Sequence, residues 1–71
     1  MSLPVSPDLP PAVAEAFDAL RRVRSMTVSV TLTQTAGRNL IRAMREAGFT
    51  QEDGVALAFH AVALGNRDAG R

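Results

Sequence analysis

The sequence contains no cysteine and one histidine, His60, among its 71 residues. Without cysteine the chain forms neither a disulfide nor a thiolate metal site, and a single histidine does not build a zinc site. A chain of this length buries only about 60% of the surface that its unfolded form exposes, so it usually needs an additional source of stability. Association with another subunit is the source that is left, and no metal or cofactor is expected.

Long apolar runs are also absent from the sequence. No stretch approaches the roughly 18 residues that are needed to cross a bilayer. The N-terminal sequence MSLPVSPDLPP lacks the basic start and the apolar core of a secretory signal. There is no Gly-rich phosphate loop, metal-ligand motif or catalytic triad. These absences predict a cytoplasmic protein that is not an enzyme and does not bind a membrane.

Lysine is missing as well, and the charges are distributed unevenly. All eight basic residues are arginine, and seven acidic residues leave a net charge of +1. Residues 1–45 carry six arginines and three acids, whereas residues 46–71 carry two arginines and four acids. Because arginine suits bidentate contacts to phosphate, the basic first part is compatible with phosphate binding.

The first 24 residues divide into an arm and a helix. Residues 1–10 are rich in proline and serine and predict a disordered or extended arm. Residues 11–24 predict an amphipathic helix, with a proline at its first position and arginines near its C-terminal end. Its apolar residues recur on one face: Val13, Phe17 and Leu20.

The segment from residue 26 to residue 33 alternates between apolar and polar residues, which predicts a half-buried β-strand. The alternating residues are Met26, Thr27, Val28, Ser29, Val30, Thr31, Leu32 and Thr33. No other segment has this pattern. Because a lone strand leaves its backbone N–H and C=O groups unpaired, we expect it to pair with the same strand of a second copy.

A second helix is expected after the strand. Thr33 or Thr35 is expected to cap its N-terminus, and it should run to about residue 47. Gly48 then provides a C′ residue, where a positive φ is needed. The apolar face of this helix consists of Ala36, Leu40, Ala43, Met44 and Ala47.

A third helix is expected to begin after Thr50 as its N-cap and to run to about residue 64. Gly65 and Asn66 are expected to end it, which leaves residues 66–71 as a short flexible tail. Its apolar residues recur at helical spacing: Val55, Ala58, Phe59 and Val62.

The sequence TVSVTLTQTAGRNLIRAMREAGFTQEDGVALAFHAVALG, residues 27–65, resembles the ribbon-helix-helix superfamily of DNA-binding proteins. The resemblance lies in the order of an alternating strand, a helix, a Gly-apolar-Thr turn and a second helix. It implies a mainly α fold with one β-strand: residues 25–65 form an intertwined homodimer with an intermolecular antiparallel two-stranded ribbon, plus the extra N-terminal helix. The implied dimer core consists of Met26, Val28, Val30, Leu32, Leu40, Met44, Val55, Phe59 and Val62.

The same resemblance implies a function, that of a small dimeric transcriptional repressor that binds double-stranded DNA. The ribbon would enter the major groove, which is wide enough to admit it. The side chains implied to contact base edges are Thr27, Ser29 and Thr31. The residues implied to contact phosphate are Arg22, Arg24, Thr50 and Gln51.

A second class of function stays open beside DNA binding. The face of the predicted ribbon carries only hydroxyl groups, and the Glu52 carboxylate competes with phosphate at the N-terminus of the last helix. In this alternative the chain is an interaction or scaffold module, or an antitoxin-like protein. It would bind a partner protein through the N-terminal helix, residues 11–24.

Overall fold

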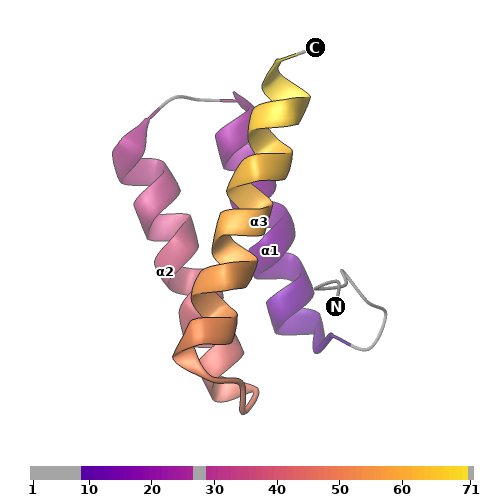
Figure 1. The fold of residues 1–71 in the computed structure, drawn as a ribbon, viewed down its shortest axis with the longest axis vertical. Helices are drawn as coiled ribbons and strands as arrows, with labels where there is room; N and C mark the ends of the chain where they lie inside the picture. The colour runs from indigo at the N-terminus through magenta and orange to yellow at the C-terminus, as the bar shows by residue number, and fades with distance from the viewer. Residues whose placement is uncertain (1–8, 27–28, 71) are drawn as a thin grey trace.

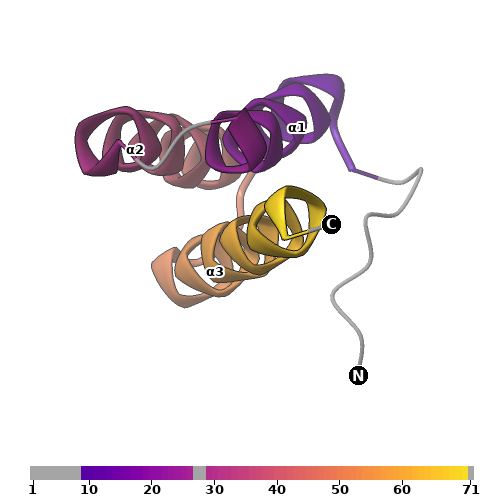
Figure 2. The ribbon, with the colours of Figure 1, turned by 90° about the horizontal axis from the view of Figure 1, so that it is seen from above.

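The computed structural model describes residues 9–26 and 29–70, which form three helices (Figure 1). α1 spans Pro11–Met26, α2 spans Val30–Glu46 and α3 spans Gln51–Ala69. In Figure 1 the chain runs up α1, down α2 and up α3. Seen from above, α1 and α2 lie in one layer and α3 packs below them (Figure 2). Each helix contacts both of the others.

The predicted ribbon-helix-helix fold is wrong, because that fold requires a β-strand and residues 9–26 and 29–70 contain none. The segment predicted as a strand is divided between the end of α1 at Met26 and the start of α2 at Val30. Thr27 and Val28 lie outside the described residues, as do residues 1–8 of the predicted arm. The described residues of this segment therefore do not form the intermolecular ribbon that the prediction required.

The alternating segment enters α2 because a helix supplies backbone partners within one chain. Ser29 is the N-cap, and its hydroxyl accepts the N–H of Leu32 at 3.3 Å. The hydroxyls of Thr33 and Thr35 each donate to the carbonyl four residues earlier, at 2.9 and 3.0 Å. A strand alone in one chain would leave these backbone groups without partners. The N-cap expected at Thr33 or Thr35 therefore lies about one to two helical turns after the observed N-cap, Ser29.

The turn between α2 and α3 follows the prediction at Gly48. Its φ is +94°, in the left-handed region that glycine adopts without steric cost. The N–H of Gly48 donates to the carbonyl of Arg45, and the N–H of Phe49 donates to the carbonyl of Met44, each at 3.0 Å. These two bonds form a Schellman motif, which satisfies two of the last carbonyls of α2.

One stripe from each helix contributes to the core. Its buried residues are Val13, Phe17, Leu20, Leu40, Met44, Leu57 and Ala61. The apolar face predicted for the first helix is therefore confirmed, and it packs inside this chain. That helix begins at residue 11 as predicted and continues to Met26, two residues beyond the predicted end.

The predicted dimer core is only partly buried within the chain. Leu40 and Met44 lie in the core, and Val55 and Val62 are half-buried. The other described members are exposed, with exposed fractions of 76% for Met26, 64% for Val30, 53% for Leu32 and 71% for Phe59. The positions from the predicted strand are exposed because the period of two does not match the 3.6-residue period of the helix that contains them.

α3 continues past the predicted end at residue 64 as far as Ala69. Gly65, which was expected to stop it, is buried inside the helix against α1. A Cβ atom at this position would lie 2.7 Å from the carbonyl oxygen of Arg21 and 2.6 Å from the Cβ of Arg24. Gly65 therefore allows a close approach between two helices and does not terminate one.

Candidate functional site

The candidate site is a groove between α2 and α3, which has a volume of about 170 Å³. α2 contributes residues at intervals of four, which places them on one face of the helix. Leu20 of α1 lies at its floor, since this side chain is fully buried. The residues that line the groove are Leu20, Thr33, Gly37, Ile41, Val55, Ala58, Phe59 and Val62.

The walls of the groove offer almost no polar atoms. Thr33 provides the one polar side chain among the lining residues, and its hydroxyl donates to the carbonyl of Ser29 at 2.9 Å. A groove of this kind attracts apolar groups, because they leave water without leaving a polar atom of the protein unpaired.

Two glycines shape the groove in different ways. A Cβ at Gly54 would lie 3.4 Å from the Cα of Ile41, so α2 and α3 are in close contact there. A Cβ at Gly37 would have no atom within 4 Å, so the wall on α2 is recessed at this point. The two helices are thus in close contact at Gly54 and leave an open space beside Gly37.

Phe59 is the most exposed large side chain of the groove, with an exposed fraction of 71%. It also borders a second hollow on the outer side of α3, lined by Gln51, Glu52, Val55, Ala56 and Phe59. From residue 55 to residue 65, VALAFHAVALG, His60 is the only polar side chain of α3. Its ring lies 5.9 Å from that of Phe17, centroid to centroid. The middle of α3, residues 55–65, is therefore apolar on its outward side as well as on the side that it turns to the core.

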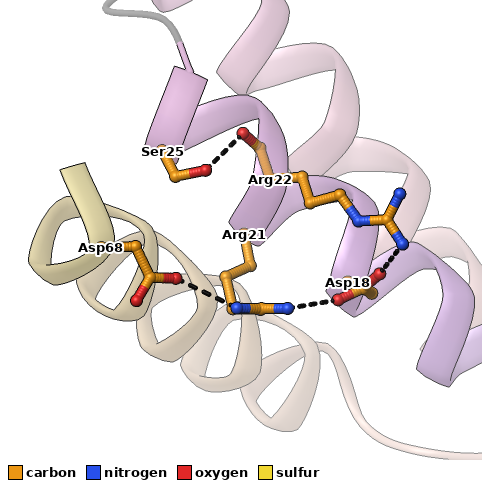
Figure 3. Close-up of polar contacts among 5 residues, drawn as sticks. All are labelled: Asp18, Arg21, Arg22, Ser25 and Asp68. Carbon is orange, nitrogen blue, oxygen red and sulfur yellow. Dashed lines mark hydrogen bonds and ion pairs between the residues drawn. The ribbon is translucent and has the colours of Figure 1, made fainter.

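Both arginines of α1 that were predicted to contact phosphate form contacts with other side chains of the chain, and Figure 3 shows those of Arg22. Arg22 pairs with Asp18 at 2.5 Å. Arg21 bridges from Asp18, at 2.7 Å, to Asp68 at the end of α3, at 3.0 Å. These pairs are partly exposed, so each contributes only modestly to stability.

The second predicted phosphate contact of α1, Arg24, donates from its Nε to the Oδ1 of Asn66 at 2.6 Å. Together with the Arg21–Asp68 pair, this bond ties α1 to the last turns of α3. Hydrogen bonding to Arg21 holds the pKa of the Asp18 carboxyl below its ordinary value. Partial desolvation opposes that shift, and Arg22 adds to it. The pKa of Arg21 is raised by its hydrogen bonds to the two aspartates.

At the N-terminus of α3, Thr50 is the N-cap that the sequence predicted. Its hydroxyl accepts the N–H of Asp53 at 3.1 Å. Gln51 is exposed beside it, and Glu52 and Asp53 place two negative charges in the first turn. The helix dipole is therefore already complemented by the protein's own carboxylates.

The hydroxyl groups predicted to contact bases do not share a strand face. Ser29 caps α2, and Thr31 is exposed on the first turn of the same helix. Thr27 lies outside the described residues. Ser29 and Thr31 therefore belong to the start of a helix and do not form the outward face of a strand.

Residues 9–26 and 29–70 contain no cluster of three or more His, Asp or Glu side chains that could hold a metal ion. None of the helices in this part of the chain is both long and apolar enough to cross a membrane.

The groove itself was not anticipated from the sequence. Its signal was present in the VALAFHAVALG segment, which is too apolar for a helix with only one buried face. The periodicity of Val55, Phe59 and Val62 indicated a helix correctly but assigned Phe59 to a core. The chain matches no protein family, no curated protein and no solved structure in the comparisons with known proteins.

Proposed function

We propose that this chain is a protein-interaction module that binds an amphipathic helix in the groove between α2 and α3. The observation that carries the proposal is that the middle of α3, residues 55–65, is apolar on its outward side as well, where Phe59 is 71% exposed. A helix that is apolar on all sides is normally covered by other protein. Full burial of a side chain like that of Phe59 stabilises a complex by about 1.5–3 kcal/mol.

The shape of the groove supports a helix as the ligand. The groove runs between two antiparallel helices, and its lining residues recur at four-residue intervals along α2 and at three- and four-residue intervals along α3. A partner helix with apolar residues at the same intervals would place one side chain after another along this line. The open space at Gly37 leaves room for one of these side chains.

The proposed surface differs from the one expected for partner binding from the sequence. That expectation assigned the contact to the apolar stripe of the N-terminal helix. In the structure Val13, Phe17 and Leu20 lie in the core of the bundle. The stripe expected to bind a partner is therefore covered within the chain, whereas the groove between α2 and α3 is open to solvent at Phe59.

A designed peptide tests the proposal. The probe is a two-heptad helix with leucine at positions i, i+3, i+7 and i+10 and with glutamine and lysine elsewhere. NMR titration of the isotope-labelled protein should shift the amide signals of Gly37, Ile41, Val55 and Val62. Phe59→Ser should weaken binding by about 30-fold, the loss expected for an aromatic anchor worth about 2 kcal/mol.

Leu32→Ser is the matched control, because Leu32 is also an exposed apolar side chain but does not line the groove. This variant should bind the probe with unchanged affinity. Signal changes spread over all three helices, or equal affinities of the two variants, would contradict binding in the groove.

A second candidate function is binding of double-stranded DNA, now by a helix instead of a ribbon. One face of α2 carries exposed residues at i, i+4, i+7, i+11 and i+14, namely Thr31, Thr35, Arg38, Arg42 and Arg45. In the part of the chain that the structure describes, these three arginines form no ion pair. Three cations along one helix face suit phosphate oxygens beside a major groove, which is wide enough to admit a helix.

This candidate predicts a salt-dependent effect of one arginine. Arg42→Ala should reduce the slope of log K against log salt by about 0.9 for a labelled duplex, because one phosphate contact is lost. Fluorescence anisotropy over a salt series measures this slope. Arg67→Ala, an exposed arginine of α3, is the control and should leave the slope unchanged. An unchanged slope for Arg42→Ala would exclude this face as the DNA contact.

A further inference from the structure

The groove and the adjoining second hollow share Val55 and Phe59, and the apolar surface that they form together carries opposite charges on its two helices. On α2, Arg38 and Arg45 lie three residues before and four residues after Ile41, which lines the groove, so both lie along its edge. On α3, Glu52 lies at the edge of the second hollow beside Phe59. The apolar surface is thus bordered by cations on one helix and by a carboxylate on the other.

We propose that the partner that covers the groove is the α2–α3 face of a second copy of this chain, in a two-fold symmetric dimer. This inference rests on the proposed function and names the partner. The two-fold axis runs parallel to α2 and α3, so that α2 of each copy packs on α3 of the other. An isologous interface of this kind is the commonest arrangement of small homo-oligomers.

Charge decides between the two possible directions of the axis. An axis perpendicular to the helices would place α2 on α2 and bring the arginine edges of both copies together. An axis parallel to the helices places the arginine edge of one copy along α3 of the other, where Glu52 lies. Like charges across an interface are costly, and complementary charges fix its register, so the parallel axis is favoured.

The close contact between α2 and α3 fixes the residue register of this dimer. Ile41 and Gly54 lie at the same level, because a Cβ at Gly54 would touch the Ile41 backbone at 3.4 Å. Arg45 and Glu52 both lie toward the connecting turn from this level. Rotation about a parallel axis preserves the levels, so Arg45 faces Glu52 of the second copy. Arg38, on the other side of Ile41, approaches Phe59 and covers it with its methylene groups.

The surface is large enough for such a dimer. A standard interface buries about 800 Å² on each partner, whereas the chain exposes 4894 Å² in total. The α2–α3 surface is one of the three sides of the bundle (Figure 2).

Charge-reversal variants in sedimentation equilibrium test the arrangement. The wild-type chain should dimerise, and Arg45→Glu and Glu52→Arg should each weaken dimerisation by about 10-fold or more, because both symmetric contacts become repulsive. An equimolar mixture of the two variants should regain wild-type affinity as a heterodimer, since each new charge then meets its opposite. Arg42→Glu makes the same charge change as Arg45→Glu. Arg42 follows Ile41 directly and so points away from the groove face of α2, and this variant should leave dimerisation unchanged.

Each outcome bears on a separate part of the proposal. A wild-type chain that stays monomeric to millimolar concentration would overturn the dimer. If the single variants are weakened but their mixture is not restored, the parallel axis is overturned. A monomer that still binds the leucine probe in the groove refutes the second copy as partner and leaves the proposed function standing. A monomer that also fails to bind the probe refutes both.

Discussion

Gly65→Ala is expected to destabilise the bundle by about 2 kcal/mol, although alanine is the better helix former. The new Cβ would lie 2.7 Å from the carbonyl oxygen of Arg21, a backbone atom that cannot rotate away. α1 and α3 must then move apart, which strains the Arg24–Asn66 hydrogen bond and loosens the core contacts nearby. For a domain of this size the midpoint of thermal unfolding should fall by roughly 8–16 °C. Circular dichroism during heating measures this midpoint.

Gly37→Ala is the matched control for this prediction. Gly37 also lies inside a helix, but a Cβ there meets no atom within 4 Å. The same substitution should therefore raise stability by about 0.5–1 kcal/mol, through helix propensity and a less flexible unfolded chain. The comparison is made at a protein concentration too low for self-association, because Gly37 lines the groove. If both variants gained stability, the close approach of α1 to α3 at Gly65 would be disproved.

The behaviour of Gly65 shows why the end of α3 could not be predicted from local sequence. Glycine after an apolar helical segment is typical of a C′ residue, and at Gly48 that interpretation was right. At Gly65 the same residue type serves a contact with a helix 40 residues away in the sequence. Local patterns do not distinguish a glycine that ends a helix from one that admits a neighbouring helix.

Sequence analysis predicted correctly those elements that depend on interactions between residues close together in the sequence. The helix from residue 11 follows from the spacing of Val13, Phe17 and Leu20, and the start of α3 follows from the Thr50 cap. The prediction of a strand was wrong because the alternating pattern was not weighed against helix formation by the same residues. Ser29 and the threonine hydroxyls can cap and bond a helix locally, whereas a strand needs a partner strand, and residues 9–26 and 29–70 contain none.

The candidate groove depends on how the helices pack, and helical periodicity alone does not determine that. Sequence periodicity correctly placed Val55, Phe59 and Val62 on one side of α3. It could not show that Leu57 and Ala61 of the same helix would take the core position and leave Phe59 outside. Because α3 is apolar almost all round, its periodicity carries little information about which face is buried.

Leu20→Ala is expected to cost about 2–5 kcal/mol, the range for removing a buried leucine and leaving a cavity. Leu20 is fully buried, and it forms part of the floor of the groove as well as of the core. A chain of 71 residues has a total stability of about 4–10 kcal/mol. The variant should therefore lose a large fraction of its stability, which urea denaturation followed by circular dichroism will show as a lower midpoint.

Leu32→Ala is the control that makes this measurement a test of the fold itself. In a ribbon-helix-helix dimer Leu32 would lie in the core, whereas on α2 it is 53% exposed. The three-helix bundle therefore predicts a change within about 0.5 kcal/mol for Leu32→Ala, as for other surface substitutions. A large loss at Leu32 with a small loss at Leu20 would contradict the bundle. The expected result, a large loss at Leu20 alone, follows from the packing of α1 against the other two helices, because that packing buries one leucine and leaves the other in solvent.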